Sequence, residues 1–276
     1  MSIKIVTDST AYIPKALLDE YDIRVISLSV LFGDEAYKET EIPYDVFYKK
    51  LVESSDLPTS SQPILMEVQE TFESVLIEGH DLIGVFISSE MSGTYQSAVM
   101  IAEELKVKYP DRKIRMIDSR SNCMQLGLSV LKGAEKVTES FEACVEKIEH
   151  VISHSRFVFI PETLEFLKRG GRIGSAKALL SSMLQIKPIL TVADGKTSVI
   201  NKVRTRKKAI SALIDIFVKD QSEAKITGGY VHHINCEKDA KDLSDKLGES
   251  FDITAIGPVI GTHVGPGAIG IAYCWE

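Results

Sequence analysis

The chain has 276 residues, of which 44% are hydrophobic and 26% are charged, so it is long enough for one or two globular domains with sizeable cores. Its formal net charge of −7 argues against general nucleic-acid binding, because neutralising phosphates requires a basic surface. No apolar run approaches the roughly 20 residues that cross a bilayer, and Asp8 interrupts the region where a signal peptide would have its apolar core, so we expect no stable membrane insertion.

The first half of the chain alternates segments that predict strands with segments that predict helices. Apolar and β-branched runs predict strands at residues 3–8, 23–32, 81–89 and 114–119. Helices are predicted at residues 14–21, 44–53, 64–78 and 94–105, and segments 129–137 and 141–152 continue the alternation. Near-continuous apolar strands separated by helices predict a parallel sheet covered by helices on both faces, in an α/β domain that we assign to residues 1–155.

The second half has a different pattern. A strand at 157–160 precedes two short helices hinged at Gly170-Gly171, and Asp194-Gly195 supplies the turn of a hairpin formed by 187–192 and 197–203. The segments that follow are a helix at 206–219, a strand at 225–233, a helix at 237–248 and strands at 252–260 and 269–275. We therefore expect a smaller C-terminal α+β domain with a mixed sheet at residues 156–276.

The cysteines indicate the compartment. They are widely spaced, without a C-x-x-C pair and without a histidine at zinc-ligand spacing: Cys123, Cys144, Cys236 and Cys274. Free thiols in the reducing cytoplasm are the plain interpretation, and we expect no metal site.

The stretch SSEMSGTYQSA (88–98) sets hydroxyl groups between a predicted strand and a predicted helix. Ligands of an open parallel sheet collect beyond the carboxyl ends of its strands, which is where Ser92 falls. A helix N-terminus favours an anion through its unpaired N–H groups and its dipole, and Gly93 lets a ligand approach the backbone. Capping of the helix by Ser92 explains the same residues without a ligand.

The stretch PTSSQP (58–63) repeats this pattern. Pro63 fits the first turn of a helix, which would set Thr59, Ser60 and Ser61 at its N-terminal end. Capping and turn formation again explain these residues by themselves. If folding brings the two serine-rich stretches together, they form a receptor for a carboxylate or a phosphate.

The stretch GTHVGPGAIG (261–270) surrounds His263 with glycine and proline, and we expect a loop there. Loops of this kind often carry binding groups. An imidazole can donate a hydrogen bond to an anion, and it changes charge near neutral pH. A structural turn is an equally good explanation of the composition.

Ser92, His263 and Asp8 raise the alternative of a serine-dependent lipid hydrolase or a transferase. The nucleophile elbow G-x-S-x-G is absent, because Glu90 occupies the position of its first glycine. The order of the three residues along the chain also differs from the order in that fold. We therefore expect no catalytic residue among them.

Positive charge gathers in two places of this acidic chain. The segment KRGGRIG matches neither phosphate-binding glycine motif. The main positive clusters, in and near this segment and in VRTRKK, are formed by Arg169, Arg172, Lys177, Arg204, Arg206, Lys207 and Lys208. A solvated surface and a docking patch for an acidic partner both explain them.

Several separate motifs in this order resemble the DegV family of bacterial fatty-acid-binding proteins, which serve a fatty acid kinase. The resemblance spans the whole chain, through IVTDSTAYIP, PTSSQP, SSEMSGTYQSA, PETLEFLKRGGRIGSAKALLSSMLQIKPIL, KVRTRKKA and GTHVGPGAIG. It implies a two-domain, non-catalytic protein that holds a long-chain fatty acid, such as palmitate, stearate or oleate, in an apolar tunnel with the carboxylate between the domains. A separate ATP-dependent kinase would then form the acyl phosphate, and no cofactor is implied.

The resemblance also assigns ligand-binding residues. The carboxylate-binding serine of the family falls on Ser92, beside Gly93 and Thr94, and its histidine falls on His263. The family usually has threonine directly before S-Q-P, where this chain keeps a hydroxyl at Ser60.

Three further residues complete the assignment. Ser61 follows Ser60 within the same motif. Arg172 and Arg204 match basic positions that the resemblance associates with docking of the kinase.

Elementary energetics divides the roles of the two ends of such a ligand. A buried carboxylate without partners is very costly, and hydroxyl and imidazole donors supply what it needs. Burial gives about 0.8 kcal/mol per methylene, or roughly 10 kcal/mol for sixteen carbons before ordering costs. The tail would give affinity, and the polar groups would select an acid over an alkane or ester. A further alternative is a regulatory protein whose basic patches bind another protein, with lipid as the signal.

Overall fold

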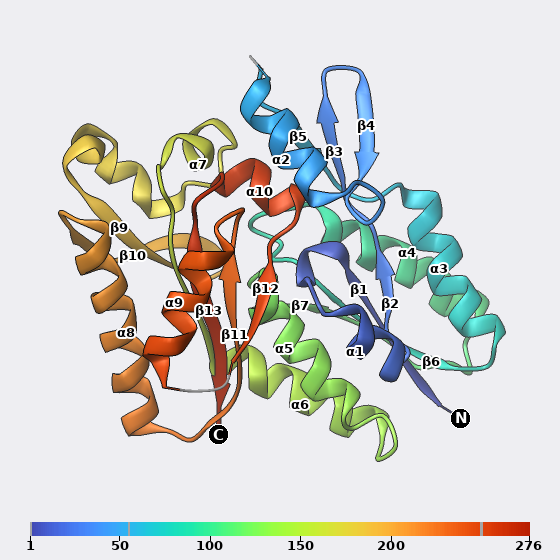
Figure 1. Cartoon of the computed structure of the whole chain (residues 1–276). Coiled ribbons are helices and arrows are strands. Elements are labelled where there is room, and N and C mark those ends of the chain that lie inside the picture. Colours follow the sequence, from blue (N-terminus) through green and yellow to red (C-terminus); the bar gives the residue numbers. More distant parts are fainter. Residues whose placement is uncertain (1, 55, 249–250) are drawn as a thin grey trace.

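The structure is a computed structural model that describes residues 2–54, 56–248 and 251–276. Its first sheet has four strands in the order β2-β1-β6-β7, and all three pairings are parallel, as predicted. Helices α3 and α4 cover one face of this sheet, and α5, on which α6 packs, covers the other (Figure 1). The bounds are β1 (Ile3–Asp8), β2 (Arg24–Ile26), β6 (Asp81–Phe86), β7 (Ile114–Asp118), α3 (Leu65–Ile77), α4 (Thr94–Lys108), α5 (Cys123–Ala134) and α6 (Phe141–Ser153).

The second sheet has six strands in the order β10-β9-β8-β13-β11-β12. Its pairings are antiparallel except for β11 with β12, so the predicted mixed sheet is confirmed. Helices α8 and α9 cover its outer face. The bounds are β8 (Ser155–Ile160), β9 (Lys187–Ala193), β10 (Lys196–Val203), β11 (Ile226–His233), β12 (Asp252–Ala255), β13 (Ile269–Trp275), α8 (Arg206–Glu223) and α9 (Glu237–Leu247).

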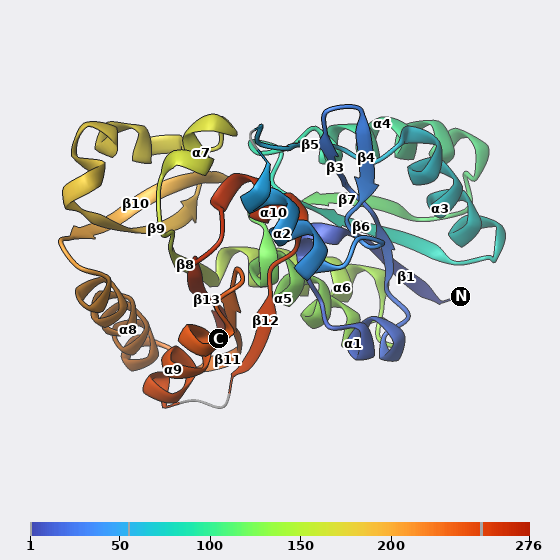
Figure 2. The same cartoon turned by 45° about the horizontal axis from the view of Figure 1, so that its top comes forward.

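The two sheets share one central core, because α5 packs against both of them (Figure 2). The two-residue repeat of the strands sends alternate side chains to the two faces. Phe157 and Phe159 join Ile83 in the central core, whereas Val158 and Ile160 join the outer core under α8 and α9. The predicted division near residue 155 coincides with the start of β8 but stays a prediction, since the core runs across it.

A third, small sheet has the order β4-β3-β5 and corrects two expectations. The single strand predicted at 23–32 is two strands in different sheets, because the chain turns at Ser27 and Leu28, where the Leu28 N–H donates to the Ser9 hydroxyl. Residues 59–61 do not begin a helix: they pair with β3 as a strand, and the helix begins only at residue 65, after Pro63. The bounds are β3 (Ser29–Phe32), β4 (Glu35–Lys38), β5 (Thr59–Ser61) and α2 (Tyr44–Glu53).

The C-terminal glycine-rich region is also different from its prediction. The strand expected at 252–260 ends at Ala255, and helix α10 (Pro258–Val264) follows, so His263 lies in the last turn of a helix and not in a loop. Glycine serves close packing here. A Cβ atom at Gly261 would come within 2.3 Å of the Tyr48 hydroxyl, and one at Gly265 within 2.2 Å of the Phe166 ring.

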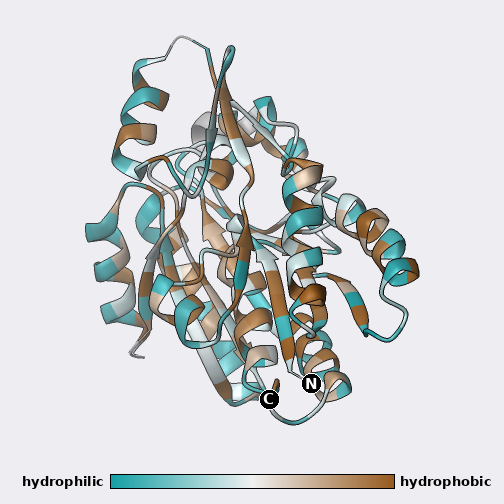
Figure 3. Cartoon of the chain, turned by 90° about the vertical axis from the view of Figure 1, so that its right-hand side faces the viewer, coloured by the Kyte–Doolittle hydropathy of each residue, from teal (hydrophilic) through white to brown (hydrophobic). Residues whose placement is uncertain are grey.

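The remaining elements are short. As predicted, two short helices flank Gly170-Gly171; the second is a 3-10 helix. The helices in view in Figure 3 mix hydrophilic and hydrophobic residues, and none of the helices in the described ranges is both long and apolar enough to cross a membrane. The bounds are a 3-10 turn (Ser9–Ala11), α1 (Lys15–Glu20), α7 (Glu165–Arg169) and the second 3-10 helix (Gly174–Gln185).

Candidate functional site

A cavity of about 240 Å³ lies within the central core and is bounded by residues from both halves of the chain. A buried water needs about 10–15 Å³ of such space, so the cavity has room for roughly twenty water-sized groups. Most of its wall is apolar, from Leu28, Ile87, Phe157, Phe159, Leu167, Val192, Ile234, Ile256, Val259, Ile260, Val264, Ala268 and Ile269.

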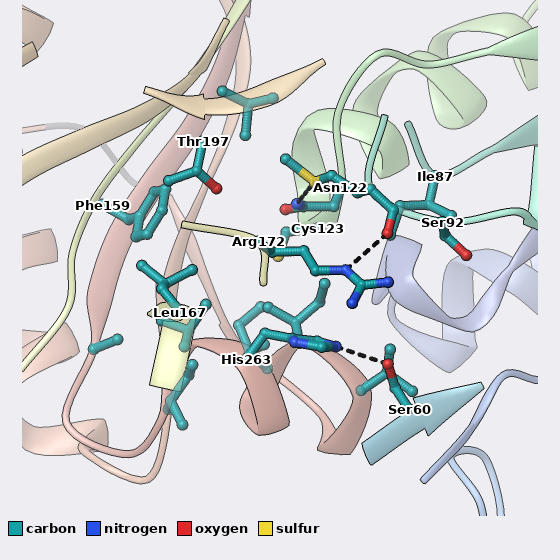
Figure 4. A pocket seen from close by; sticks show the side chains of 18 of the residues that line it. Ser60, Ile87, Ser92, Asn122, Cys123, Phe159, Leu167, Arg172, Thr197 and His263 are labelled. Carbon is teal, nitrogen blue, oxygen red and sulfur yellow. Dashed lines mark hydrogen bonds between the residues drawn. The ribbon is translucent and has the colours of Figure 1, made fainter. Parts of the chain in front are cut away.

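Polar residues from segments far apart in the sequence also line the cavity; Ser60, Ser92, Arg172 and His263 lie near one another, whereas Thr197 lies beside Phe159 (Figure 4). The two serine-rich stretches meet there: Gln62 Oε1 accepts a hydrogen bond from Ser97 Oγ at 3.1 Å. The same oxygen lies so near Gly93 that a Cβ atom there would come within 2.7 Å of it. The polar lining residues are Ser60, Ser61, Gln62, Ser92, Gly93, Asn122, Arg172, Thr197, His232, His233 and His263.

Ser92 follows the buried strand β6, at the start of α4. Its hydroxyl is 2.8 Å from that of Thr94 and accepts a weak bond from the Thr94 N–H at 3.3 Å. Gly93 is the N-cap residue and has no side chain, so the Ser92 hydroxyl is the acceptor for this N–H of the first turn. Thr94 is buried and does not line the cavity. Thr94, predicted to bind the ligand, therefore contacts Ser92 and not the cavity.

His263 joins the second serine-rich stretch to helix α10. Its Nε2 is 2.7 Å from Ser60 Oγ (Figure 4). Its Nδ1 is shut off from solvent and has no partner in the described part of the chain. Gly170 makes room for the ring, because a Cβ atom there would come within 2.1 Å of Nδ1. Burial, helped by the nearby Arg172 charge, lowers the pKa of His263 to about 4, so the imidazole is neutral at pH 7.

Arg172 lines the cavity beside these groups, although the sequence suggested only a docking role for it. Its Nε donates to the Met91 carbonyl at 3.1 Å, and its Nη1 donates to the Gly170 carbonyl at 2.8 Å. The side chain thus reaches from the loop after α7 to the loop before α4, and Figure 4 shows it between Ser92 and His263. The position of Arg172 beside a glycine pair was the only sequence signal that placed it near a site.

Arg204 lies elsewhere. It is exposed between β10 and α8, it does not line the cavity, and it makes no hydrogen bond or ion pair with the described residues. The structure therefore separates the two arginines that the resemblance groups together.

The residues of the alternative hydrolase are not linked to one another. The Ser92 hydroxyl bonds to Thr94, and His263 bonds to Ser60. Asp8 is fully buried and accepts from Thr10 and from the Ile87 N–H. No hydrogen bond within the described ranges connects Ser92, His263 and Asp8 into a triad.

Two buried polar groups of the wall were missed by sequence reasoning. Asn122 donates to the Met91 sulfur at 3.1 Å, and its Oδ1 has no partner among the described residues. His232 accepts a bond from the Met124 N–H at 3.3 Å, and burial lowers its pKa to about 3. Neither residue lies in a recognisable motif. In the ranges that the structure describes, no three His, Cys, Asp or Glu side chains are grouped to hold a metal ion.

Comparison with known proteins gives consistent matches over the whole chain. Residues 2–276 match the family described as uncharacterised protein, DegV family. A DegV domain-containing protein of Clostridium acetobutylicum is 45% identical over 282 residues, which cover 100% of this chain and 99% of the relative. The solved structure of a fatty-acid-binding DegV family protein from Thermus thermophilus has a TM-score of 0.93 at 31% identity, with 100% of both chains covered. A stearic acid-binding protein from Eubacterium ventriosum has a TM-score of 0.91 at 26% identity, with 99% of this chain and 98% of that chain covered.

Proposed function

This chain belongs to the DegV family, and we propose that it binds a long-chain fatty acid in the cavity of the central core. The observation that carries the proposal is the cavity itself, because a mostly apolar wall adjoins the neighbouring polar residues Ser60, Ser92, Arg172 and His263. Room for roughly twenty water-sized groups suits the non-hydrogen atoms of a sixteen- to eighteen-carbon acid. The fatty-acid-binding relatives share the whole fold.

The carboxylate lies at the polar part of the wall. The Ser92 hydroxyl donates one hydrogen bond to it, and the hydrogen-bonded pair of Ser60 and neutral His263 donates another with the proton that is not shared between them; Ser61 and the backbone at Gly93 lie beside them. Because His263 is neutral at pH 7, Arg172 supplies the positive charge that an ionised carboxylate needs. The acyl chain follows the apolar wall and gains about 0.8 kcal/mol for each methylene buried.

The bound acid is the substrate of a separate ATP-dependent kinase. That enzyme transfers the terminal phosphoryl group of ATP to a carboxylate oxygen, which gives an acyl phosphate and ADP. This chain contributes no nucleophile: it holds and presents the acid, and its exposed Arg204 contributes to docking of the kinase. All four cysteines carry free thiols, which suits the reducing cytoplasm, and we assign the protein to that compartment.

Replacement of Ser92 by alanine tests the binding proposal. The Ser92→Ala protein, purified under native conditions, is expected to retain clearly less fatty acid than the unaltered protein when both are measured by native mass spectrometry. Ser89→Ala is the matched control, because Ser89 lies in the same loop but does not line the cavity. Equal lipid content in Ser92→Ala and in the unaltered protein would refute the assignment of Ser92.

A further inference from the structure

Helix α10, which carries His263, is not capped by its own sequence. Its N-cap residue is Gly257, which has no side chain to accept a hydrogen bond. The acceptor comes from the other half of the chain: Glu39, just after β4, accepts from the Val259 N–H at 2.8 Å. A carboxyl oxygen at this position satisfies an unpaired donor of the first turn.

Glu39 is part of a buried network. Its side chain is almost fully enclosed and accepts hydrogen bonds from the Ser9 hydroxyl and from the Tyr12 hydroxyl, the latter at 2.7 Å. The Tyr12 oxygen in turn accepts from the Ile260 N–H at 3.2 Å. Two consecutive N–H groups of α10 therefore donate hydrogen bonds to one glutamate–tyrosine pair.

The surrounding packing explains why the acceptor is supplied from outside the helix. A Cβ atom at Gly257 would come within 2.7 Å of the Tyr44 hydroxyl and 2.8 Å of the Tyr12 ring, so no capping side chain fits there. The Tyr48 hydroxyl donates to the Ile256 carbonyl at 2.6 Å, just before the helix. The start of α10 is thus seated by residues 12, 39, 44 and 48, all from the first half of the chain.

We propose that Glu39 is a positioning residue for carboxylate recognition, acting through helix α10 on His263; this inference rests on the proposed function. From Val259 to His263 is four residues, or about 6 Å along the helix axis. Over one turn the helix moves as a unit, so a shift at Val259 carries the imidazole away from Ser60. Glu39 does not line the cavity. Because α10 also supplies Val259, Ile260 and Val264 to the apolar wall, the effect on the head group is measured as the ratio of affinities for two ligands that share a tail.

The test measures discrimination between hexadecanoic acid and hexadecan-1-ol, which share a tail and differ in the head group. In the unaltered protein the acid is expected to bind more tightly. Glu39→Met keeps the length of the side chain and removes the acceptor, and it should lower the ratio of acid affinity to alcohol affinity by roughly tenfold. Glu39→Gln keeps an acceptor oxygen for the Val259 N–H and should restore most of the discrimination.

Two further proteins separate positioning from general damage. Asp220→Asn is the matched control: Asp220 is also a buried carboxylate that accepts from a tyrosine, Tyr273, but it lies outside the cavity wall. It should lower the melting temperature without changing the acid-to-alcohol ratio. In a His263→Ala background, Glu39→Met should not lower the acid-to-alcohol ratio further, because both residues act on the head group through one contact.

An acid-to-alcohol ratio that Glu39→Met leaves unchanged, or an equal loss of both ligands, would overturn the inference. If Glu39→Met does not fold, Tyr12→Phe, which removes the acceptor for the Ile260 N–H, takes its place and should lower the ratio in the same direction. The proposed function fails on a different result. An unaltered protein that binds neither ligand, or prefers the alcohol, would overturn it together with this inference.

Discussion

Arg172→Gln is expected to lower affinity for a long-chain fatty acid by about fivefold to thirtyfold at low salt. The other donors at the polar end of the cavity are neutral at pH 7, because Ser60 and Ser92 carry hydroxyls and burial lowers the pKa of His263 to about 4. Arg172 is therefore the charged group of the cavity wall that can balance an ionised carboxylate.

The size of the effect follows from how Arg172 is placed. A hydrogen bond that involves a charged group contributes about 1.5–3 kcal/mol when it is shielded from water, and an exposed ion pair contributes about 0–1 kcal/mol. Arg172 is exposed, yet two backbone carbonyls hold its guanidinium in place and lower the entropy cost of pairing. We therefore expect Arg172 to contribute about 1–2 kcal/mol to the free energy of binding, which corresponds to the fivefold to thirtyfold change in affinity given above.

Isothermal titration of the delipidated protein with hexadecanoic acid measures this effect. The difference between the two proteins should shrink as salt is raised, because exposed charges are screened. Arg169→Gln is the control, since Arg169 is also exposed but pairs with Glu165 and does not line the cavity. If Arg172→Gln bound the acid as tightly as the unaltered protein at low salt, the carboxylate would not use this charge, and the reasoning would be refuted.

The remaining predictions concern pH and docking. Burial lowers the pKa of His263 to about 4. Between pH 6.5 and 4 the unfolded chain therefore binds a proton that the folded chain does not, and stability falls as the pH falls. Measured by urea unfolding, His263→Gln should reduce this pH-dependent loss of unfolding free energy by up to about 3 kcal/mol. The part of the loss that His232 causes should remain. An unchanged dependence of the unfolding free energy on pH would contradict the prediction. With fatty acid bound, Arg204→Glu should slow phosphorylation by the proposed kinase severalfold and leave the affinity for the fatty acid unchanged. Lys106→Glu on α4 is the control and should not slow the reaction. Unchanged turnover with Arg204→Glu would count against docking through Arg204.

The layered architecture could be predicted because its signals are local. The apolar spacing at 44–53 predicts α2 with the bounds that the structure shows, and Asp194-Gly195 predicts the turn between β9 and β10. Successive side chains of β8 join the central and the outer core in turn, which follows from the two-residue repeat of a strand. Such patterns do not require knowledge of which elements meet.

The candidate site could be predicted in its residue types but not in its geometry. Gly257, Gly261 and Gly265 are spaced four residues apart along one side of α10, yet glycines near a proline predict a loop when their neighbours are unknown. The positions of tyrosine and phenylalanine rings from distant segments explain why these positions hold glycine. The position of Arg172 could not be predicted for the same reason: its side chain is held in the cavity wall by the carbonyl of Met91, which lies in the other half of the chain.

The polar end of the cavity is held in place by contacts that do not involve a ligand. On one side, Glu39 and Tyr48 fix α10. On the other, the hairpin turn between β9 and β10 is fastened to the first half: the Ser88 hydroxyl donates to the Gly195 carbonyl at 2.8 Å, and Arg120 donates to the Asp194 carbonyl at 2.6 Å. Groups that are already positioned lose little entropy when a ligand arrives. Burial of the tail therefore provides most of the affinity, and the fixed donors mainly determine which head group is accepted.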